Sequence, residues 1–488
     1  MKTNINKLLI SSTLNIKDAL QVINENGLSA CFIVDKDSSK MIGIVTDGDI
    51  RRAILRNVDL FSSIMEISNR KFHYASIGDT SEKINSILSD NIKILPLLDS
   101  TGIPVDYATI SHLRYLPIYE PSLHGNELSY LNECIKTGWI SSQGRFVKEF
   151  ENKFKEFINV PYALSTSNGT TALHLALVVL GIGPGDEVIV PDFTFVASIN
   201  SIIYTGATPV LIDVNKDTFN IDTSLIEDKI THRTKAIMPV HLYGNPCDMD
   251  EILLIAKKYN LKVIEDAAEA FGSEFKGIKT GAFGDIGCFS FFGNKTITTG
   301  EGGMMVFKNE ELFIKAKILR DHGMLPEKKY WHAYVGYNYR MTNMQAAIGV
   351  AQLERAKEII EKKIQIGKGY RRELCKNILG IRLVKENTNS VNTYWLFSLV
   401  IESELGWNKG KIQQKLQDNG IETRNLFYPL HVMPPYNKYI KKDDKFHVTE
   451  YLSENGFSLP SSTFINDDNI KEIARIFSET YQMNTILK

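Results

Sequence analysis

The sequence predicts an α/β fold in which a mostly parallel sheet lies between helices, with a smaller α+β part before it and another after it. From residue 116 onward, short apolar runs alternate with segments of helical periodicity, which is typical of βα units. Before residue 116, a pattern of about 45 residues occurs twice, which indicates an internal repeat. The 488 residues, 43% hydrophobic and 23% charged, suit several ordinary globular domains.

The repeat fills the first 115 residues, and each copy is expected to run helix, strand, strand, helix. Apolar residues at helical spacing alternate with short apolar runs bounded by polar turns. The expected elements are Ile16–Asn26, Ala30–Asp35, Met41–Thr46 and Asp49–Arg56 in the first copy, then Ser81–Leu88, Ile92–Leu98, Ile103–Tyr107 and Ile110–Leu113 in the weaker second copy.

The proline-marked junction Leu116–Pro121 leads into the larger α/β part. Its expected strands are Ala163–Ser165, Glu187–Pro191, Pro209–Asp213, Ala236–His241, Lys262–Glu265, Gly287–Phe291 and Gly303–Phe307. Its expected helices are Thr171–Leu180, Ala197–Tyr204, Met249–Tyr259 and a long one at Gln345–Lys363, before extended segments at Val391–Val400 and Glu422–Tyr428. Because the strands are apolar almost throughout, helices should cover both faces of their sheet.

Charge, cysteines and hydropathy exclude several classes of protein. The 56 Lys and Arg balance 57 Asp and Glu, so no basic excess is present to hold nucleic acid. The five cysteines are scattered without a C-x-x-C pair, which speaks against a disulfide scaffold and a thiolate metal site. No apolar run reaches the ~18 residues of a membrane span, and the N-terminal apolar stretch is short for a secretory signal. We therefore expect a cytoplasmic protein without a membrane span or bound metal.

A turn of small residues, Ser165–Thr171, stands between a predicted strand and a predicted helix. Backbone N–H groups at a helix N-terminus can hold a phosphate, although such residues also simply cap helices. A second glycine pattern, Gly281, Gly284 and Gly287, is spaced G-x-x-G-x-x-G and precedes a strand. It therefore does not match a dinucleotide-binding turn.

Two further segments carry candidate catalytic groups. Asp266 and Glu269 follow an apolar strand, at the sheet edge where α/β proteins bind ligands. Lys295 follows another apolar strand and precedes the glycine-rich Gly300–Gly303. Asp266 could merely cap a segment, and a lone Lys usually lies along the surface. Together with the phosphate turn, however, a carboxylate for a pyridinium and an amine for a Schiff base are what pyridoxal phosphate (PLP) requires.

On these motifs, residues 116–488 resemble the DegT/DnrJ/EryC1/StrS sugar aminotransferases, which have the type I PLP-dependent fold. The resemblance implies a PLP-binding large domain at 116–365 and a small C-terminal domain at 366–488. It implies that Lys295 forms the Schiff base, Asp266 pairs with the pyridine nitrogen and Glu269 lies beside the ring hydroxyl. The other implied cofactor-binding residues are Gly169, Thr170 and Ser290 at the phosphate, Thr171 next to them, Phe195 on the ring, and Asn338 from the second subunit of a homodimer.

The resemblance also implies the reaction. Relatives with His in place of the lysine dehydrate sugars, so Lys295 favours transamination from L-glutamate, which leaves 2-oxoglutarate. The expected acceptor is the C4 ketone of a nucleotide-linked 4-keto-6-deoxyhexose used for surface polysaccharide. Three stretches, Arg320–Met324, Tyr330–His332 and Gly336–Thr342, favour GDP-4-keto-6-deoxymannose, giving GDP-perosamine. A UDP-4-keto sugar and a non-catalytic, nucleotide-sensing protein are the alternatives. The sequence assigns no role to His241, His322 or His431.

The first 115 residues resemble a tandem CBS domain pair, a Bateman module. The likeness rests on Gly43–Asp49, where Thr46 and Asp49 match residues that bind the ribose of an adenine nucleotide in that family. The corresponding stretch of the second repeat, Gly102–Thr109, lacks this pair, so one nucleotide per subunit is expected. Alternatively, Thr46 and Asp49 only cap the next helix.

Overall fold

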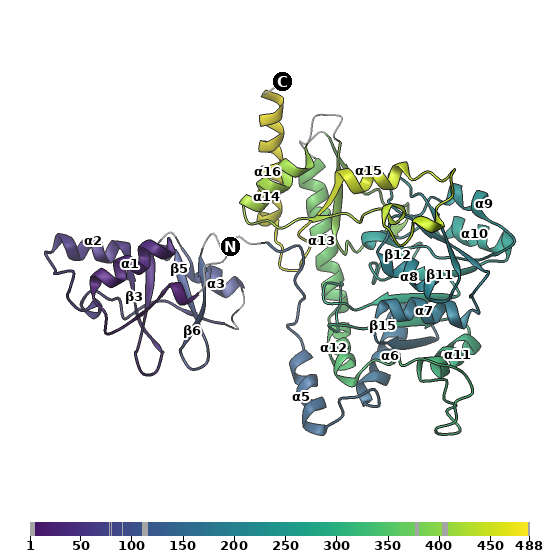
Figure 1. Cartoon of the computed structure of the whole chain (residues 1–488), viewed down its shortest axis with the longest axis horizontal. Coiled ribbons are helices and arrows are strands. Elements are labelled where there is room, and N and C mark those ends of the chain that lie inside the picture. The colour runs from purple at the N-terminus through teal and green to yellow at the C-terminus, as the bar shows by residue number, and fades with distance from the viewer. Residues whose placement is uncertain are drawn as a thin grey trace. The chain divides into compact units, whose positions relative to one another are not determined.

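The computed structural model describes residues 5–77, 79, 81–89, 91–109, 116–375, 380–402 and 408–486. The chain divides into two compact units, Met1–Leu116 and Pro117–Lys488, each of which is described by itself (Figure 1). The predicted module boundary at residue 115 lies one residue from this division. The further division at residue 365 stays a prediction, and the helix expected at Ile110–Leu113 lies outside the described residues.

The N-terminal unit contains two three-stranded sheets of the same topology. In each sheet the first strand pairs parallel with the second, and the second pairs antiparallel with the third. The strands are β1 (Leu9–Ser11), β2 (Ala30–Val34) and β3 (Met41–Thr46), then β4 (Ala75–Ser76), β5 (Ile94–Leu98) and β6 (Pro104–Thr109), with helices α1 (Ile16–Asn26), α2 (Asp47–Leu55) and α3 (Ser81–Ile87). The structure thus contains the predicted repeat. The short β1 and β4 were not expected, because two or three residues carry no periodicity.

A seven-stranded sheet forms the centre of the second unit, in the order β7-β15-β14-β11-β10-β8-β9. Its strands are β7 (Tyr162–Thr166), β8 (Glu187–Pro191), β9 (Thr208–Ile212), β10 (Thr234–Ile237), β11 (Lys262–Asp266), β14 (Ile286–Ser290) and β15 (Gly303–Phe307). All neighbouring pairs are parallel except the two that β15 makes. The predicted mostly parallel sheet is therefore confirmed. The strand expected at Ala236–His241 ends earlier, at Ile237.

Helices cover both faces of this sheet, as the apolar strands predicted (Figure 1). Leu164, Cys288 and Met305 pack on the side of α7 (Gly169–Val179), while their strand neighbours pack toward α6 (Arg145–Ile158). The other helices are α5 (Glu127–Thr137), α8 (Val196–Tyr204), α9 (Ile226–Lys229), α10 (Met249–Tyr259), α11 (Glu310–Arg320), α12 (Asn343–Glu354), α13 (Ala356–Cys375), α14 (Lys409–Asp418), α15 (His447–Asn455) and α16 (Asp467–Ile486).

The long helix predicted at Gln345–Lys363 is wrong, because α12 and α13 are separate helices. Arg355 leaves helical geometry with φ −109° and ψ 6°, and its N–H turns back to the carbonyls of Gln352 and Leu353. Its guanidinium instead contacts Ser122 and Glu358. The helix-forming residues on both sides gave no sign of this break.

The C-terminal part contains a four-stranded antiparallel sheet in the order β16-β18-β20-β19. Its strands are β16 (Ile381–Leu383), β18 (Phe397–Ile401), β19 (Arg424–Asn425) and β20 (Gly456–Leu459), while β12 (Glu274–Phe275), β13 (Ile278–Lys279) and β17 (Ser390–Val391) form another small sheet. The segment expected to be extended at Val391–Val400 is interrupted at Tyr394, whose φ is +48°. The segment Glu422–Tyr428 contributes only the two residues of β19.

A buried carboxylate holds the loop that contains the three regularly spaced glycines. Glu265 of β11 accepts backbone N–H bonds from Gly281, Phe283 and Gly284, each at 2.7 Å. Close packing explains the small residues, since a Cβ on Gly284 would lie 2.5 Å from the carbonyl oxygen of Val263. The glycine pattern is therefore structural, and its loop is hydrogen-bonded to Glu265 of β11.

Candidate active site

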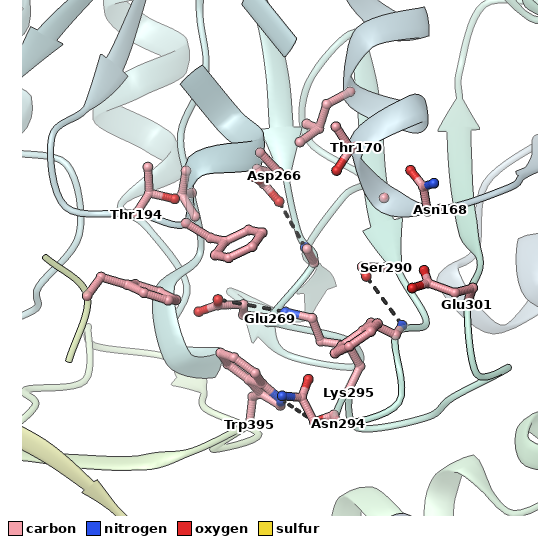
Figure 2. Close-up of a pocket in the computed structure, with 18 of the residues that line it drawn as sticks. Asn168, Thr170, Thr194, Asp266, Glu269, Ser290, Asn294, Lys295, Glu301 and Trp395 are labelled. Carbon is pink, nitrogen blue, oxygen red and sulfur yellow. Dashed lines mark hydrogen bonds and ion pairs between the residues drawn. The ribbon is translucent and has the colours of Figure 1, made fainter. Parts of the chain in front are cut away.

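A cavity of about 370 Å³ opens at the carboxyl ends of the central strands. Its lining comes from the β7–α7 turn, the segment before α8, the ends of β11 and β14, and the C-terminal part of the chain (Figure 2). Ligands of α/β sheets bind at this edge. The described lining residues are Asn168, Gly169, Thr170, Leu173, Thr194, Phe195, Ala197, Val240, Asp266, Ala268, Glu269, Ser290, Phe292, Asn294, Lys295, Glu301, Trp395, Arg424 and Phe427.

Lys295 presents its amine inside this cavity, and only 13% of its side chain is exposed. The Nζ atom lies 3.7 Å from Glu269 Oε1 and 3.9 Å from the centroid of the Trp395 ring (Figure 2). Burial lowers the pKa of the Lys295 amine, and the carboxylates of Glu269 and Asp266 oppose this effect. A partly desolvated amine of this kind is suited to attack a carbonyl group.

Asp266 ends β11 with its carboxylate buried at the cavity wall. Ser198 of α8 donates a 2.7 Å hydrogen bond to Oδ2, and the backbone N–H of Ala268 donates to Oδ1 at 3.2 Å. Burial raises the pKa of Asp266, and these donors together with Lys295 counteract it. A buried carboxylate at a cavity wall is well placed to pair with a cationic group of a ligand.

Glu269 is the second buried carboxyl group of the cavity. Its Oε2 accepts the backbone N–H of Tyr243 at 2.9 Å, while its Oε1 faces the amine of Lys295. Burial raises the pKa of Glu269 to about 7, although Lys295 opposes the shift. Glu269 can therefore hold a proton near neutral pH and share it with a neighbouring hydroxyl group.

The predicted phosphate turn lies at the cavity wall, where Asn168, Gly169 and Thr170 begin α7. A Cβ added at Gly169 would lie 2.8 Å from the Cβ of Ser290, so Gly169 and Ser290 are in close contact. Asn168 caps the helix by accepting the N–H of Thr171 at 2.9 Å, and the Thr171 hydroxyl donates to the Asn168 carbonyl. Because this bond occupies only the Thr171 N–H, the amides at the very start of the helix stay available to an anion.

Seven of the nine predicted cofactor-binding residues line the cavity, and Thr171 and Asn338 do not. Thr171 is occupied by the helix cap. Asn338 is exposed and forms an isolated bridge with Asp321, so its predicted contact with another subunit stays a prediction. The exposed ring of Phe195 borders the cavity, with its centroid 6.0 Å from that of Phe427.

Sequence reasoning missed several residues of the site. Ser198, which bonds Asp266, gave no signal because the two residues are 68 positions apart. Trp395 lies over Lys295, and its indole N–H donates to the carbonyl of Asn294 at 2.6 Å. Arg424 brings a guanidinium to the cavity, and no carboxylate of the described residues forms an ion pair with it. Of these residues, only Trp395 has an aromatic side chain of the kind that often borders ligand sites, but its position over Lys295 gave no signal in the sequence.

The residues present fit PLP. The turn at Gly169, the carboxylate of Asp266 and the amine of Lys295 match the phosphate, the pyridine nitrogen and the aldehyde. Asn294, which lines the same cavity, has a buried side-chain oxygen without a hydrogen-bond partner among the described residues. The fold and the site thus define a PLP-dependent enzyme. Residues 121–478 match the DegT/DnrJ/EryC1/StrS aminotransferase family, and the chain belongs to this family.

Individual relatives agree with this assignment over nearly their whole length. The chain is 48% identical over 369 residues to the GDP-perosamine synthase of Escherichia coli O157:H7, covering 76% of this chain and 99% of the relative. It is 45% identical over 358 residues to the GDP-perosamine synthase of Vibrio cholerae, covering 73% and 97%. Spr1654 from Streptococcus pneumoniae, solved in its PLP form, is similar with a TM-score of 0.70 and 29% identity, covering 76% and 99%. The predicted PLP-dependent aminotransferase is confirmed.

His241, His322 and His431, to which the sequence assigned no role, have structural partners. His241 Nδ1 accepts the backbone N–H of Cys247 at 3.0 Å, so the ring carries its proton on Nε2, 3.0 Å from Glu265. His431 Nδ1 lies 2.7 Å from Asp192, which raises the pKa of His431 against the opposing effect of burial. Neither ring lines the cavity. The exposed His322 has a φ of +58° and its carbonyl accepts from His332.

In the N-terminal unit, residues 3–56 match the CBS domain. Here Thr46 and Asp49 form a capping box at the start of α2, with the Thr46 hydroxyl 2.6 Å from Asp49 Oδ2. Arg52 pairs with the other oxygen of Asp49 at 2.5 Å. Both side chains are therefore engaged with their own helix, and nucleotide binding stays a prediction.

The described residues contain no helix that is both long and apolar enough to cross a membrane. They also contain no group of three or more His, Cys, Asp and Glu side chains arranged to hold a metal ion.

Proposed function

We propose that this enzyme transfers the amino group of L-glutamate to the C4 ketone of GDP-4-keto-6-deoxymannose, giving GDP-perosamine and 2-oxoglutarate. The observation that carries the chemistry is the buried Lys295 amine beside Glu269 and Asp266 in one cavity. The choice of sugar is supported by relatives named GDP-perosamine synthase, which are 45% to 48% identical to this chain over almost their whole length.

Lys295 is the residue that moves the proton. When bound, PLP supplies an electron sink for the carbon that loses a proton. With the cofactor bound, the Nζ atom would take the proton from the substrate carbon and return it two bonds away, to the carbon of the cofactor's aldehyde group. Burial lowers the pKa of this amine, which favours the neutral form that a base requires. The Trp395 ring beside it shields this amine from water.

The two buried carboxyl groups, Asp266 and Glu269, have different roles toward the cofactor. Asp266, oriented by Ser198, would pair with the pyridine nitrogen of the bound cofactor and keep that nitrogen protonated. Glu269, whose pKa burial raises to about 7, would share a hydrogen bond with the ring hydroxyl of the bound cofactor, and it forms an ion pair with the Lys295 amine at 3.7 Å. The two environments differ because Asp266 has a side-chain hydroxyl donor and Glu269 has only a backbone donor.

Arg424 is the group that receives the amino donor. Its guanidinium lines the cavity without a carboxylate partner among the described residues, and L-glutamate carries two carboxylates. Arginine binds a carboxylate through two parallel hydrogen bonds, which Lys cannot reproduce. Arg424→Lys should therefore raise the KM for glutamate while leaving the affinity for PLP close to that of the wild type.

The reaction is tested by colour and by product. Purified protein should be yellow, and borohydride should bleach it by reducing the bond between Lys295 and the cofactor. Lys295→Ala should lose transamination, whereas Lys308→Ala, a surface lysine bonded to the Phe283 carbonyl, should keep it. A Lys295→Ala protein that still transfers the amino group would refute the assignment of Lys295.

The sugar is tested by competition between nucleotides. The protein is incubated with glutamate and either GDP- or UDP-4-keto-6-deoxyhexose, and the amino sugar is measured by mass spectrometry. Conversion of the GDP sugar with the higher kcat/KM supports the proposal. A higher kcat/KM for the UDP sugar would replace it with a UDP-4-keto-sugar aminotransferase.

We also infer that the enzyme is a homodimer in which Asn338 reaches the partner's cavity. Asn338 is exposed, and so are the large side chains shortly before it, Tyr330, Trp331, Tyr334 and Val335. A cluster of exposed aromatic residues is typical of an interface. Sedimentation analysis tests the dimer. Mixing Asn338→Ala with Lys295→Ala tests the shared site, because a mixed dimer then recovers one intact cavity.

A further inference from the structure

Lys363 lies at the centre of α13 with 1% of its surface exposed, and it has no carboxylate partner among the described residues. Lysine is almost never fully buried, because its long stem normally carries the charge to water. The amine instead donates to two backbone carbonyls, of Ser461 at 2.7 Å and of Trp395 at 3.1 Å. It also lies 4.9 Å from the centroid of the Tyr119 ring.

Two of these partners hold the segment that carries Lys295. The Tyr119 hydroxyl donates a 2.5 Å hydrogen bond to the carbonyl of Lys295 itself. Trp395 donates its indole N–H to the Asn294 carbonyl and places its ring over the Lys295 amine. Lys363 thus contacts the residues that fix Lys295 at its backbone and at its side chain.

The third partner ties this arrangement to the rest of the unit. Ser461 donates its N–H to the Ile118 carbonyl at 2.9 Å, and its hydroxyl oxygen accepts the N–H of Phe397 at 2.8 Å. An apolar side chain in place of Lys363 would leave the carbonyls of Trp395 and Ser461 without their donor. Unpartnered buried polar groups are costly, so these segments would shift.

We propose that Lys363 is a positioning residue for Lys295. The amine of Lys363 fixes Trp395 and Tyr119, and these two residues fix the reactive amine of Lys295. This inference rests on the proposed function, because it takes Lys295 as that amine. Without Lys363, the Trp395 ring moves from its place and water reaches Lys295. Since burial is what lowers the pKa of Lys295, that pKa then rises toward its ordinary value.

The test uses Lys363→Met, which keeps the length of the stem, and Tyr370→Phe as the matched control. Tyr370 is buried on the same helix, and its hydroxyl donates to the carbonyl of Pro460, next to Ser461, at 2.9 Å. In cofactor-free protein, the pH dependence of Lys295 acylation by an amine reagent is followed by peptide mass spectrometry. We expect the midpoint to rise by about one pH unit in Lys363→Met and to stay at the wild-type value in Tyr370→Phe.

Activity gives the second measurement. Loading with PLP should leave Lys363→Met with a kcat about tenfold to a hundredfold lower and a nearly unchanged KM, because a misplaced catalytic group costs this much. If Lys363→Met does not fold, Tyr119→Phe replaces it. This variant removes the hydroxyl that donates to the Lys295 carbonyl at 2.5 Å and to the Thr296 carbonyl at 3.5 Å, and its acylation midpoint should also rise.

An acylation midpoint at the wild-type value in the folded variant would overturn the inference, as would an equal shift in Tyr370→Phe. The proposed function fails separately, through the activity of Lys295→Ala.

Discussion

Removal of the Ser198 hydroxyl, which donates to Asp266, should strongly reduce both PLP binding and the rate of transamination. Ser198→Ala deletes the 2.7 Å hydrogen bond from the Ser198 hydroxyl to Asp266 Oδ2. It also removes the 3.1 Å hydrogen bond between the hydroxyl groups of Ser198 and Thr194. Because both residues are buried, no water replaces the donor. A hydrogen bond to a charged group contributes about 1.5–3 kcal/mol, which corresponds to a factor of roughly 10 to 150.

This loss should appear in two measurements. The pKa of Asp266 rises, so its carboxylate holds the protonated cofactor nitrogen less well, and the dissociation constant of PLP should increase at least about tenfold. An absorbance titration of cofactor-free protein with PLP measures this constant. Single-turnover kinetics with glutamate should be slower by a similar factor.

Ser201→Ala is the control, because Ser201 is buried in the same helix but donates at 2.7 Å only to the carbonyl of Ser198. PLP binding by Ser198→Ala within twofold of the wild type would refute the reasoning, as would an equal loss in Ser201→Ala.

Three further predictions concern other parts of the chain. Gly169→Ala places a Cβ 2.8 Å from that of Ser290, so PLP affinity should fall severalfold in the absorbance titration, whereas Gly183→Ala, whose nearest contact would be 3.7 Å away, should bind normally. Asp49→Ala removes half of a capping box, worth about 1 kcal/mol, so hydrogen exchange should quicken in α2 and not in α1; unchanged exchange would contradict the cap. Burial lowers the pKa of Lys363 from 10.5 to about 7, so the unfolded chain binds the extra proton between these values and stability rises with pH. In urea unfolding, the free energy of unfolding should be about 2 kcal/mol higher at pH 9 than at pH 7 because of this group, and Lys363→Met should lack this increase.

The sequence predicted those parts of the fold that depend on local pattern. Continuous apolar runs located the strands of the central sheet, and Met249–Tyr259 matches α10 in full because its apolar spacing and Asp248 cap are both local. The direction of β15 could not be predicted, since an antiparallel strand in a buried sheet has the same apolar composition as a parallel one. The break at Arg355 likewise depends on partners distant in sequence, such as Ser122.

The same division applies to the site. Asp266 and Lys295 could be predicted because Asp266 stands at the end of one apolar strand and Lys295 lies shortly after another, and the two strands are neighbours in the sheet. Arg424 and Trp395 could not, because the path of the C-terminal part over the cavity depends on packing. Thr171 lies in the phosphate turn but directs its hydroxyl to the helix cap, so its predicted part in cofactor binding stays a prediction.

Glu265 and Asp266 are neighbours on one strand and face opposite ways, one toward the glycine loop and the other toward the cavity. Successive residues of a strand alternate between its two sides, so a shift of β11 by a single position would exchange them. The carboxylate that holds the loop would then face the cofactor, and Asp266 would face backbone amides. The backbone hydrogen bonds from Gly281 and Gly284 to Glu265 therefore fix the register of β11 in the sheet. A folding error at this strand would yield a compact protein that still contains every catalytic residue but cannot assemble the site.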